Sequence, residues 1–150
     1  MASTPYTVTN GIVLRETVTK ESDKILTLLT RDLGRVSVIA RGARRKNSKF
    51  AACAQSLVYG EWTLYRRGEW YYANEGGTLE LFAGLRQDLE AMALGFYMAE
   101  LTECVTTEDT ASDDILRHLL NGLYALSALH KPPRLGWKCV FLSGAGPGGL

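Results

Sequence analysis

A β-hairpin is predicted by the stretch KILTLLTRDLGRVSVIAR, residues 24–41. Two runs rich in aliphatic and β-branched residues, 24–31 and 35–41, flank the step Asp32-Leu33-Gly34. Glycine accepts the positive φ that a tight turn between antiparallel strands requires. The pattern therefore indicates two adjacent antiparallel strands that turn at Gly34.

Similar runs lie on both sides of this hairpin. Strands are predicted at Gly11–Thr17, Leu57–Arg66 and Glu69–Leu81, and the last two meet at the turn signal Arg66-Arg67-Gly68-Glu69. A longer connection, 42–56, separates the third strand from the fourth. Five strands in roughly 80 residues fit a small Greek-key barrel, for which the five-stranded OB-fold is the leading candidate and an SH3-like barrel the alternative.

The spacing of apolar residues becomes helical after residue 82. A 4-3-4-3 spacing predicts one buried helical face, made of Leu85, Leu89, Met92, Phe96 and Ala99. A second helix is predicted over 112–130, with a buried stripe made of Leu116, Leu119, Leu120, Leu123 and Leu126. The sequence Thr110-x-x-Asp113 resembles a capping box at its start, and Pro132-Pro133 is expected to end it.

Composition excludes several classes of protein. Apolar residues make up 46% of the 150 residues and charged residues 22%, which is typical of a globular chain. No apolar run approaches the roughly 20 residues of a membrane-spanning helix. The three cysteines, Cys53, Cys104 and Cys139, contain no C-x-x-C pair, so we expect ordinary thiols and a cytoplasmic location.

No motif predicts an enzyme, a cofactor or a metal site. The glycine-rich end, 144–149, matches G-x-G-x-x-G, but it contains Pro147 and no helix follows it, so a dinucleotide site is rejected. His118 and His130 have no Cys or carboxylate at i+3 or i+4 that would favour a metal site. We therefore expect no catalytic residues.

The charge is distributed unevenly. The whole chain carries a net charge of +1, but residues 1–82 contain 12 basic and 8 acidic residues, and residues 83–150 contain 5 and 8. Residues 35–49 contain six cations and no acid. Such asymmetry favours a polyanionic partner for the first half of the chain.

Cations beside aromatic side chains are typical of single-strand binders, which track the phosphates electrostatically and stack bases on rings. The cations are Arg41, Arg44, Arg45, Lys46 and Lys49. The aromatic candidates are Trp62, Tyr65, Trp70, Tyr71 and Tyr72, of which alternation lets only one of the last two face inward. A solvated basic loop and a protein-binding barrel remain alternatives at this point.

An ordered set of short motifs resembles the N-terminal part of the bacterial DNA repair protein RecO family. The motifs are Gly11-Ile12-Val13-Leu14-Arg15, Glu21-Ser22-Asp23-Lys24-Ile25, Leu28-Leu29-Thr30, Gly34, Ala40-Arg41-Gly42-Ala43-Arg44-Arg45, Tyr59-Gly60-Glu61, Leu64-Tyr65, Phe82-x-Gly84-Leu85-Arg86-x-Asp88-Leu89 and Tyr97-x-Ala99-Glu100-Leu101. The resemblance covers about residues 10–134.

The resemblance implies an N-terminal OB-fold, a following α-helical domain, and binding of single- and double-stranded DNA with annealing of complementary strands. It also implies work with the RecR partner and single-strand-binding protein in loading RecA. The DNA-binding role is carried onto the five loop cations named above, with Lys24 and Arg35 as further candidates on strands and Tyr65 as an aromatic candidate.

The chain departs from the family pattern in length and at its C-terminal end. RecO-like proteins usually exceed 200 residues, and many carry a C-terminal cysteine cluster, often zinc-binding, which is absent here. We therefore expect an α+β chain with an OB-fold barrel over 1–82, an incomplete α-helical domain over 83–134 and a disordered glycine-rich tail over 135–150. An incomplete helical domain is expected to expose leucine-rich surface. The rival hypothesis is a barrel adaptor that binds a protein partner.

Overall fold

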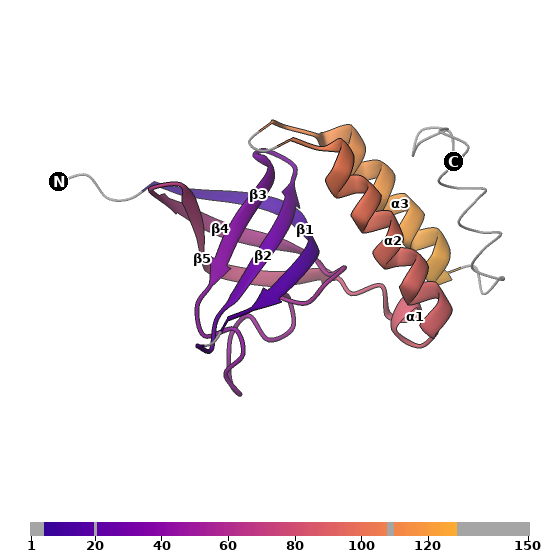
Figure 1. Ribbon diagram of the computed structural model, residues 1–150, viewed down its shortest axis with the longest axis horizontal. Helices are drawn as coiled ribbons and strands as arrows, with labels where there is room; N and C mark the ends of the chain where they lie inside the picture. Colours follow the sequence, from indigo (N-terminus) through magenta and orange to yellow (C-terminus); the bar gives the residue numbers. More distant parts are fainter. Residues whose placement is uncertain (1–4, 20, 108–109, 129–150) are drawn as a thin grey trace.

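The computed structural model describes residues 5–19, 21–107 and 110–128 of the chain. Within these residues, five strands are followed by three helices (Figure 1). Their bounds are β1 Tyr6–Val18, β2 Lys24–Thr30, β3 Gly34–Ala40, β4 Tyr59–Arg67, β5 Trp70–Glu80, α1 Ala83–Arg86, α2 Leu89–Val105 and α3 Asp113–Ala128. The expected proline stop after the second helix, His130, Cys139 and the glycine-rich end lie outside the described residues.

The strands form a closed barrel in the order β1-β2-β3-β5-β4, with β1 also paired to β4. This confirms the predicted five-stranded OB-type barrel followed by helices. The two predicted turns hold glycines at positive φ, Gly34 at 73° and Gly68 at 63°. The first strand is longer than predicted: it begins at Tyr6, and its register to β2 shifts between Val13 and Arg15 so that one strand can serve two partners.

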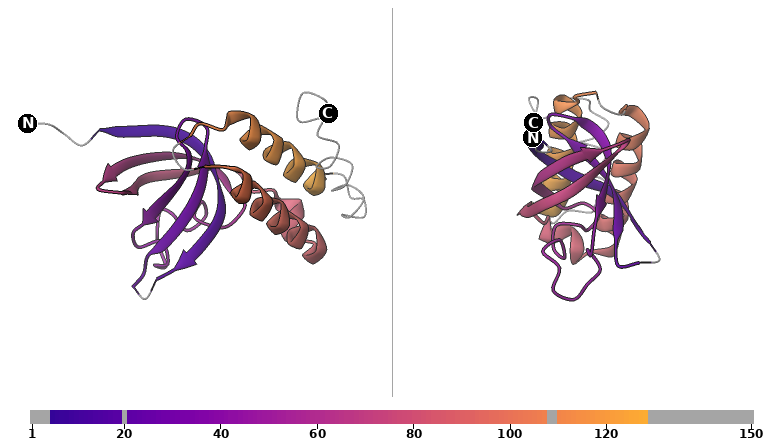
Figure 2. Two further views of the ribbon diagram at one scale, coloured as in Figure 1. Left: turned by 45° about the horizontal axis from the view of Figure 1, so that its top comes forward. Right: turned by 90° about the vertical axis from the view of Figure 1, so that its left-hand side faces the viewer.

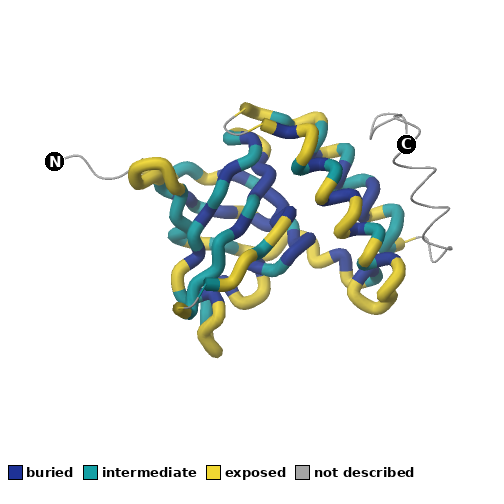
Figure 3. The backbone as a smooth tube through the Cα atoms, viewed as in Figure 1, coloured by how far each residue is buried: buried dark blue, intermediate teal, exposed yellow. Residues whose placement is uncertain are grey.

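Strand alternation divides the apolar residues into two cores. Val13 faces the interior of the barrel, where it packs with residues such as Leu26 and Trp62. Its neighbours Ile12 and Leu14 face the helices and pack with residues such as Met98. Figure 3 shows buried positions concentrated in the barrel and where it meets the helices. The barrel and the helices therefore share β1 as a common wall.

The predicted buried face of the first long helix is confirmed only in part: Leu85, Met92 and Ala99 pack in the core between barrel and helices, but Leu89 and Phe96 do not. Asp88 caps a new helix by accepting from the backbone N–H groups of Glu90 and Ala91, so Leu85 belongs to the separate short helix α1. On α2 the side chains of Leu89 and Phe96 are 90% and 45% exposed. The buried residues of α2 are Ala91, Gly95, Met98, Ala99 and Thr102. Apolar residues lie all around α2, so their spacing alone did not identify the buried face.

The predicted stripe of the second long helix is confirmed. Leu116, Leu119 and Leu123 are buried, and Leu120 and Leu126 pack partly buried against the same core. The helix begins at Asp113, later than a cap at Thr110 would place it, and the Leu116 N–H donates to the Ser112 carbonyl at 3.0 Å. α2 and α3 lie side by side on one side of the barrel (Figures 1 and 2).

Two contacts join the barrel to the helices at the β2–β3 turn. Arg35 donates from Nε to Thr106 Oγ1 at 3.1 Å and from Nη2 to the Thr106 carbonyl at 3.0 Å. A Cβ on Gly34 would collide with the Thr110 backbone, so the turn and the α2–α3 connection approach closely. No helix in the part of the chain that the structure describes is long and apolar enough to cross a membrane.

Candidate nucleic-acid interface

The basic segment after β3 is held against the β1–β2 turn by backbone contacts. The chain leaves β3 at Gly42, whose φ of 69° suits glycine. The Gly42 N–H donates to Asp23 Oδ1 at 2.7 Å, and the Arg44 N–H donates to the Ser22 carbonyl at 2.9 Å. These bonds fix where the cations of the connection begin.

Arg44 uses its side chain to reinforce this attachment. Its Nη1 donates to the Thr19 carbonyl at 2.9 Å and to the Glu21 carbonyl at 3.3 Å. One nitrogen makes both contacts, because Nη1 carries two N–H groups. Arg44 therefore holds the connection after β3 against the β1–β2 turn. The charge of Arg44 in the sequence did not indicate this structural role.

The middle of the connection turns back into the barrel. Phe50, Cys53 and Ala54 are buried, and Phe50 stacks on Trp62 with ring centroids 6.1 Å apart. Burial raises the pKa of the Cys53 thiol. Trp62 has no exposed surface, so the expectation that it could stack on bases is wrong. Alternation places Trp62 on the same side of β4 as Leu64, inside the barrel.

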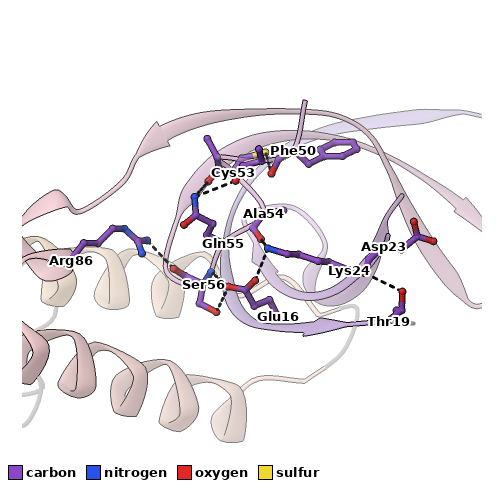
Figure 4. A network of polar contacts seen from close by, with 12 residues as sticks. Glu16, Thr19, Asp23, Lys24, Phe50, Cys53, Ala54, Gln55, Ser56 and Arg86 are labelled. Carbon is purple, nitrogen blue, oxygen red and sulfur yellow. Dashed lines mark hydrogen bonds and ion pairs between the residues drawn. The ribbon is translucent and has the colours of Figure 1, made fainter. Parts of the chain in front are cut away.

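Lys24 belongs to a polar network behind the basic segment. Its Nζ lies 2.7 Å from Glu16 Oε1 and donates to the Ala54 carbonyl at 2.9 Å, and its side chain is only 14% exposed. Figure 4 shows the Glu16 carboxylate between Lys24 and Ser56, with Arg86 reaching the Ser56 carbonyl. The Lys24 ammonium group is thus engaged in structural contacts, and the proposed DNA contacts below do not include it.

The pKa values in this network follow from burial and charge. Burial raises the pKa of Glu16, but hydrogen bonds from Lys24 and Ser56 together with the Lys24 charge outweigh it, so the pKa lies below 4.5. Burial lowers the pKa of Arg86, and the Glu16 carboxylate opposes that shift. The network joins β1, the long connection and α1 through one carboxylate.

Arg35 is likewise used inside the protein. Its two hydrogen bonds to Thr106 direct the guanidinium toward the end of α2 and away from the basic segment. The strand candidates Lys24 and Arg35 therefore each have a structural partner, and neither lines the hollow formed by the loop cations.

Four loop cations line one hollow of about 460 Å³. Arg41, Arg45, Lys46 and Lys49 all contribute to its wall. Lys49 pairs with Glu75 at 3.4 Å, whereas Arg45 and Lys46 form no ion pair or side-chain hydrogen bond with any described residue. Glu21 and Asp23 line a neighbouring hollow of about 450 Å³ together with Arg41 and Arg45, without an ion pair to either. The first hollow therefore offers unpaired cations of the kind that bind phosphates.

A row of outward-facing residues crosses the five strands beside these cations. Strand register places them directly opposite one another in the order Thr17, Ile25, Ile39, Tyr72, Tyr65 and Tyr6. The rings of Tyr65 and Tyr72 stack with centroids 5.5 Å apart and an angle of 17°. Tyr6 meets Tyr65 edge-on at 5.7 Å. The structure thus brings the aromatic candidate Tyr65 next to a partner, Tyr6, that the sequence analysis missed because the first strand was predicted to start at Gly11.

Arg41 connects the aromatic row with the basic hollow. Its guanidinium carbon lies 4.9 Å from the centroid of the Tyr72 ring. Tyr71, one residue earlier, packs instead against the barrel core, in line with the expected alternation. Trp70 is 41% exposed near the β4–β5 turn. Arg41 and the half-buried rings of Tyr72 and Tyr65 therefore lie on one side of the barrel.

Another hollow, of about 410 Å³, lies between α2 and α3. Leu101, Val105 and Ile115 contribute to its mostly apolar wall. Within residues 5–19, 21–107 and 110–128 no group of His, Cys, Asp or Glu is placed to hold a metal ion. The chain thus presents one basic, aromatic surface on the barrel and one apolar surface on the helices.

Known proteins match this chain over most of its length. Residues 1–82 match the family model described as Recombination protein O N terminal. The protein named DNA repair protein RecO from Acetivibrio thermocellus is 34% identical over 128 residues, which cover 85% of this chain and 51% of the relative. The proteins of the same name from Caldicellulosiruptor bescii and Bacillus subtilis are 37% and 34% identical, covering 79% and 78% of this chain and 48% and 46% of the relatives. The chain spans about half the length of the curated relatives it matches.

Proposed function

The chain belongs to the RecO family, and from this premise we propose that it binds DNA and anneals complementary strands in recombinational repair. The contact surface is the side of the barrel that carries the basic hollow and the tyrosine row. The observation that carries this proposal is the pair Arg45 and Lys46, which are exposed and form no ion pair with any described residue.

Phosphate contacts supply the affinity in this proposal. Lysine and arginine side chains that neutralise phosphates release condensed counterions, so binding weakens as salt increases. Arg45 and Lys46 are free to do this, and Arg41 lies beside them in the same hollow. Because phosphates are the same in every sequence, little sequence preference is expected.

Annealing follows from the same charges. Two DNA strands repel each other through their phosphates, and a cationic surface lowers this repulsion when both strands lie near it. No nucleotide hydrolysis is needed for this step. Cooperation with RecR and single-strand-binding protein, and a contribution to RecA loading, are proposed from family membership alone.

A protein-binding adaptor is the second candidate function. The apolar hollow between α2 and α3 favours it, since exposed apolar surface commonly marks an interaction site. In that case the basic hollow would serve an acidic protein, and neutralising it would leave DNA affinity unchanged.

The experiment is fluorescence anisotropy of labelled single-stranded DNA, titrated with the chain at several salt concentrations. The test variant is Arg45→Ala/Lys46→Ala. The matched control is Arg31→Ala/Arg117→Ala, which removes the same charge from two ion-paired sites elsewhere. We expect the test variant to lose affinity and the salt slope to flatten by about 0.7 for each lost contact. Equal affinity and slope in test and control variants would contradict the proposal.

A further inference from the structure

We propose that Tyr72 is a nucleobase-stacking residue and that a base of single-stranded DNA exchanges with the Arg41 guanidinium that covers its ring in the free protein. This inference rests on the proposed DNA-binding function and deepens it. It assigns separate tasks to the two parts of the surface: the loop cations bind phosphates, and Tyr72 binds one base by its face.

The contact between Arg41 and Tyr72 is suited to exchange. The guanidinium carbon is 4.9 Å from the ring centroid, and Arg41 is exposed. In the part of the chain that the structure describes, Arg41 has no ion pair and donates no side-chain hydrogen bond, so this contact alone holds it over the ring. Exposed cation–π contacts are weak, and a planar base offers a larger stacking area to the same face.

Once it leaves the ring, the Arg41 guanidinium can contact a phosphate of the same DNA strand. Arg41 also lines the basic hollow together with Arg45 and Lys46. A strand whose phosphates follow this hollow carries its bases alongside, toward the tyrosine row. Arg41 can therefore move from the Tyr72 ring to a phosphate while a base stacks on the ring. Its positive charge then neutralises that phosphate.

The opposite face of Tyr72 is braced. Strand β5 lies between β3 and β4, so Arg41, which follows β3, and Tyr65, on β4, approach Tyr72 from opposite sides. Tyr65 stacks on Tyr72 at 5.5 Å, and Tyr6 supports Tyr65 edge-on at 5.7 Å. Tyr65 and Tyr6 are thus positioning residues, which fix the Tyr72 ring before DNA arrives and lower the entropic cost of stacking.

The geometry selects single strands. In a duplex, neighbouring bases cover each other's faces at about 3.4 Å per step, so no internal base can stack on an external ring. A single strand can offer a base face. Stacking also leaves the base-pairing edge of the held base free, so a strand bound in this way can still pair with its complement. The arrangement is therefore compatible with annealing.

The test compares oligothymidine with an abasic oligonucleotide of the same length, which has the same phosphates and no bases. We expect Tyr72→Leu to weaken binding of oligothymidine about 5- to 150-fold. Binding of the abasic oligonucleotide and the salt slope are expected to stay unchanged, because no charge is removed. Tyr72→Phe keeps the ring and is expected to bind like the unchanged chain. Tyr124→Leu, which removes an exposed tyrosine from α3, is the matched control.

A direct readout covers the case in which Tyr72→Leu does not fold. Tyr72→Trp keeps an aromatic ring at the site, and we introduce it together with Trp70→Phe, because Trp70 is exposed nearby. Compared with Trp70→Phe alone, the added fluorescence is expected to be quenched by oligothymidine and not by the abasic oligonucleotide. Equal quenching by both, or equal loss of affinity for both in Tyr72→Leu, would overturn base stacking while leaving the phosphate contacts of the proposed function intact. Failure of the unchanged chain to bind either oligonucleotide would overturn both proposals.

Discussion

The Nζ atom of Lys24 lies 2.7 Å from Oε1 of Glu16, and Oε2 of the same carboxylate accepts hydrogen bonds from the backbone N–H and the hydroxyl of Ser56. One half-buried carboxylate therefore ties β1 to the start of β2 and to the end of the basic connection. The loop that carries the proposed DNA contacts is fixed at its far end by this charge.

Acid is expected to weaken the fold through Glu16. Its pKa is lower in the folded protein than the ordinary value of 4.5, so its stabilising contribution is complete above that value and is lost as pH falls through the lower, folded-state pKa. Glu16→Gln is expected to lower stability at neutral pH and to flatten the loss of stability below about pH 4.5. Urea unfolding at several pH values measures this, with Glu61→Gln on the exposed side of β4 as control. The same acid dependence in both variants would contradict the assignment.

Two glycines at positive φ are expected to differ in how they tolerate alanine. At Gly68 nothing lies within 4 Å of a built Cβ, so Gly68→Ala meets only backbone strain, about 1–2 kcal/mol. At Gly34 the added methyl group also collides with the backbone of Thr110, and a loss of about 3 kcal/mol or more is expected. Denaturant midpoints of the two variants give the comparison. Equal losses would show that the β2–β3 turn and the α2–α3 connection are not in close contact.

Arg44 and Arg45 are expected to respond differently to lysine. Nη1 of Arg44 donates to two backbone carbonyls of the β1–β2 turn, and the shorter side chain of lysine does not bring its ammonium group to the same position. Arg45 has only its charge to contribute to the proposed interface. Arg45→Lys is therefore expected to retain affinity for single-stranded DNA, and Arg44→Lys to lose most of what Arg44→Ala loses. Anisotropy titrations of the three variants decide this; full rescue by Arg44→Lys would show that Arg44 acts as a charge alone.

The buried face of α2 is testable by truncation. Met98 has no exposed surface and lies in the core between barrel and helices, so Met98→Ala is expected to cost about 2–5 kcal/mol. Leu89 is 90% exposed, and Leu89→Ala is expected to stay within about 0.5 kcal/mol. Comparable losses of stability at both positions in thermal or denaturant unfolding would show that Leu89 is buried, as the sequence spacing predicted.

The fold was largely predictable because its strands follow simple alternation. The run 24–41 contains both strands of its hairpin and the glycine that turns it, and each feature is local. The extension of β1 to Tyr6 was not predictable in this way, since residues 6–12 are held by pairing with β4. The face of the first long helix was predicted only in part for a related reason. Packing against Ile12 and Leu14 selects the buried residues of α2, and local spacing does not indicate these partners.

The site was predictable in its chemistry and less so in its geometry. The sequence located the basic segment, but hydrogen bonds to backbone carbonyls, which no side-chain pattern records, separate Arg44 from Arg45. Alternation along β4 could have excluded Trp62, because it shares parity with Leu64, whereas Tyr65 has the opposite parity. The ring contact of Arg41 with Tyr72 joins two strands that are far apart in the chain, and pattern alone did not reveal it.

The barrel is closed between β3 and β5 by only two residue pairs, Val38 with Tyr71 and Ile39 with Tyr72. The partners are roughly 30 residues apart, so the chain entropy lost in joining them is larger than for any of the short-turn hairpins. The β1–β4 pairing joins residues still further apart in the chain, such as Tyr6 with Tyr65, so both long-range pairings cost more chain entropy than the hairpins. Arg41 and Tyr72 lie on opposite sides of the β3–β5 seam. A ligand that contacts both sides of the seam binds only the closed barrel and therefore stabilises it. A single DNA strand bound by both Arg41 and Tyr72 is such a ligand.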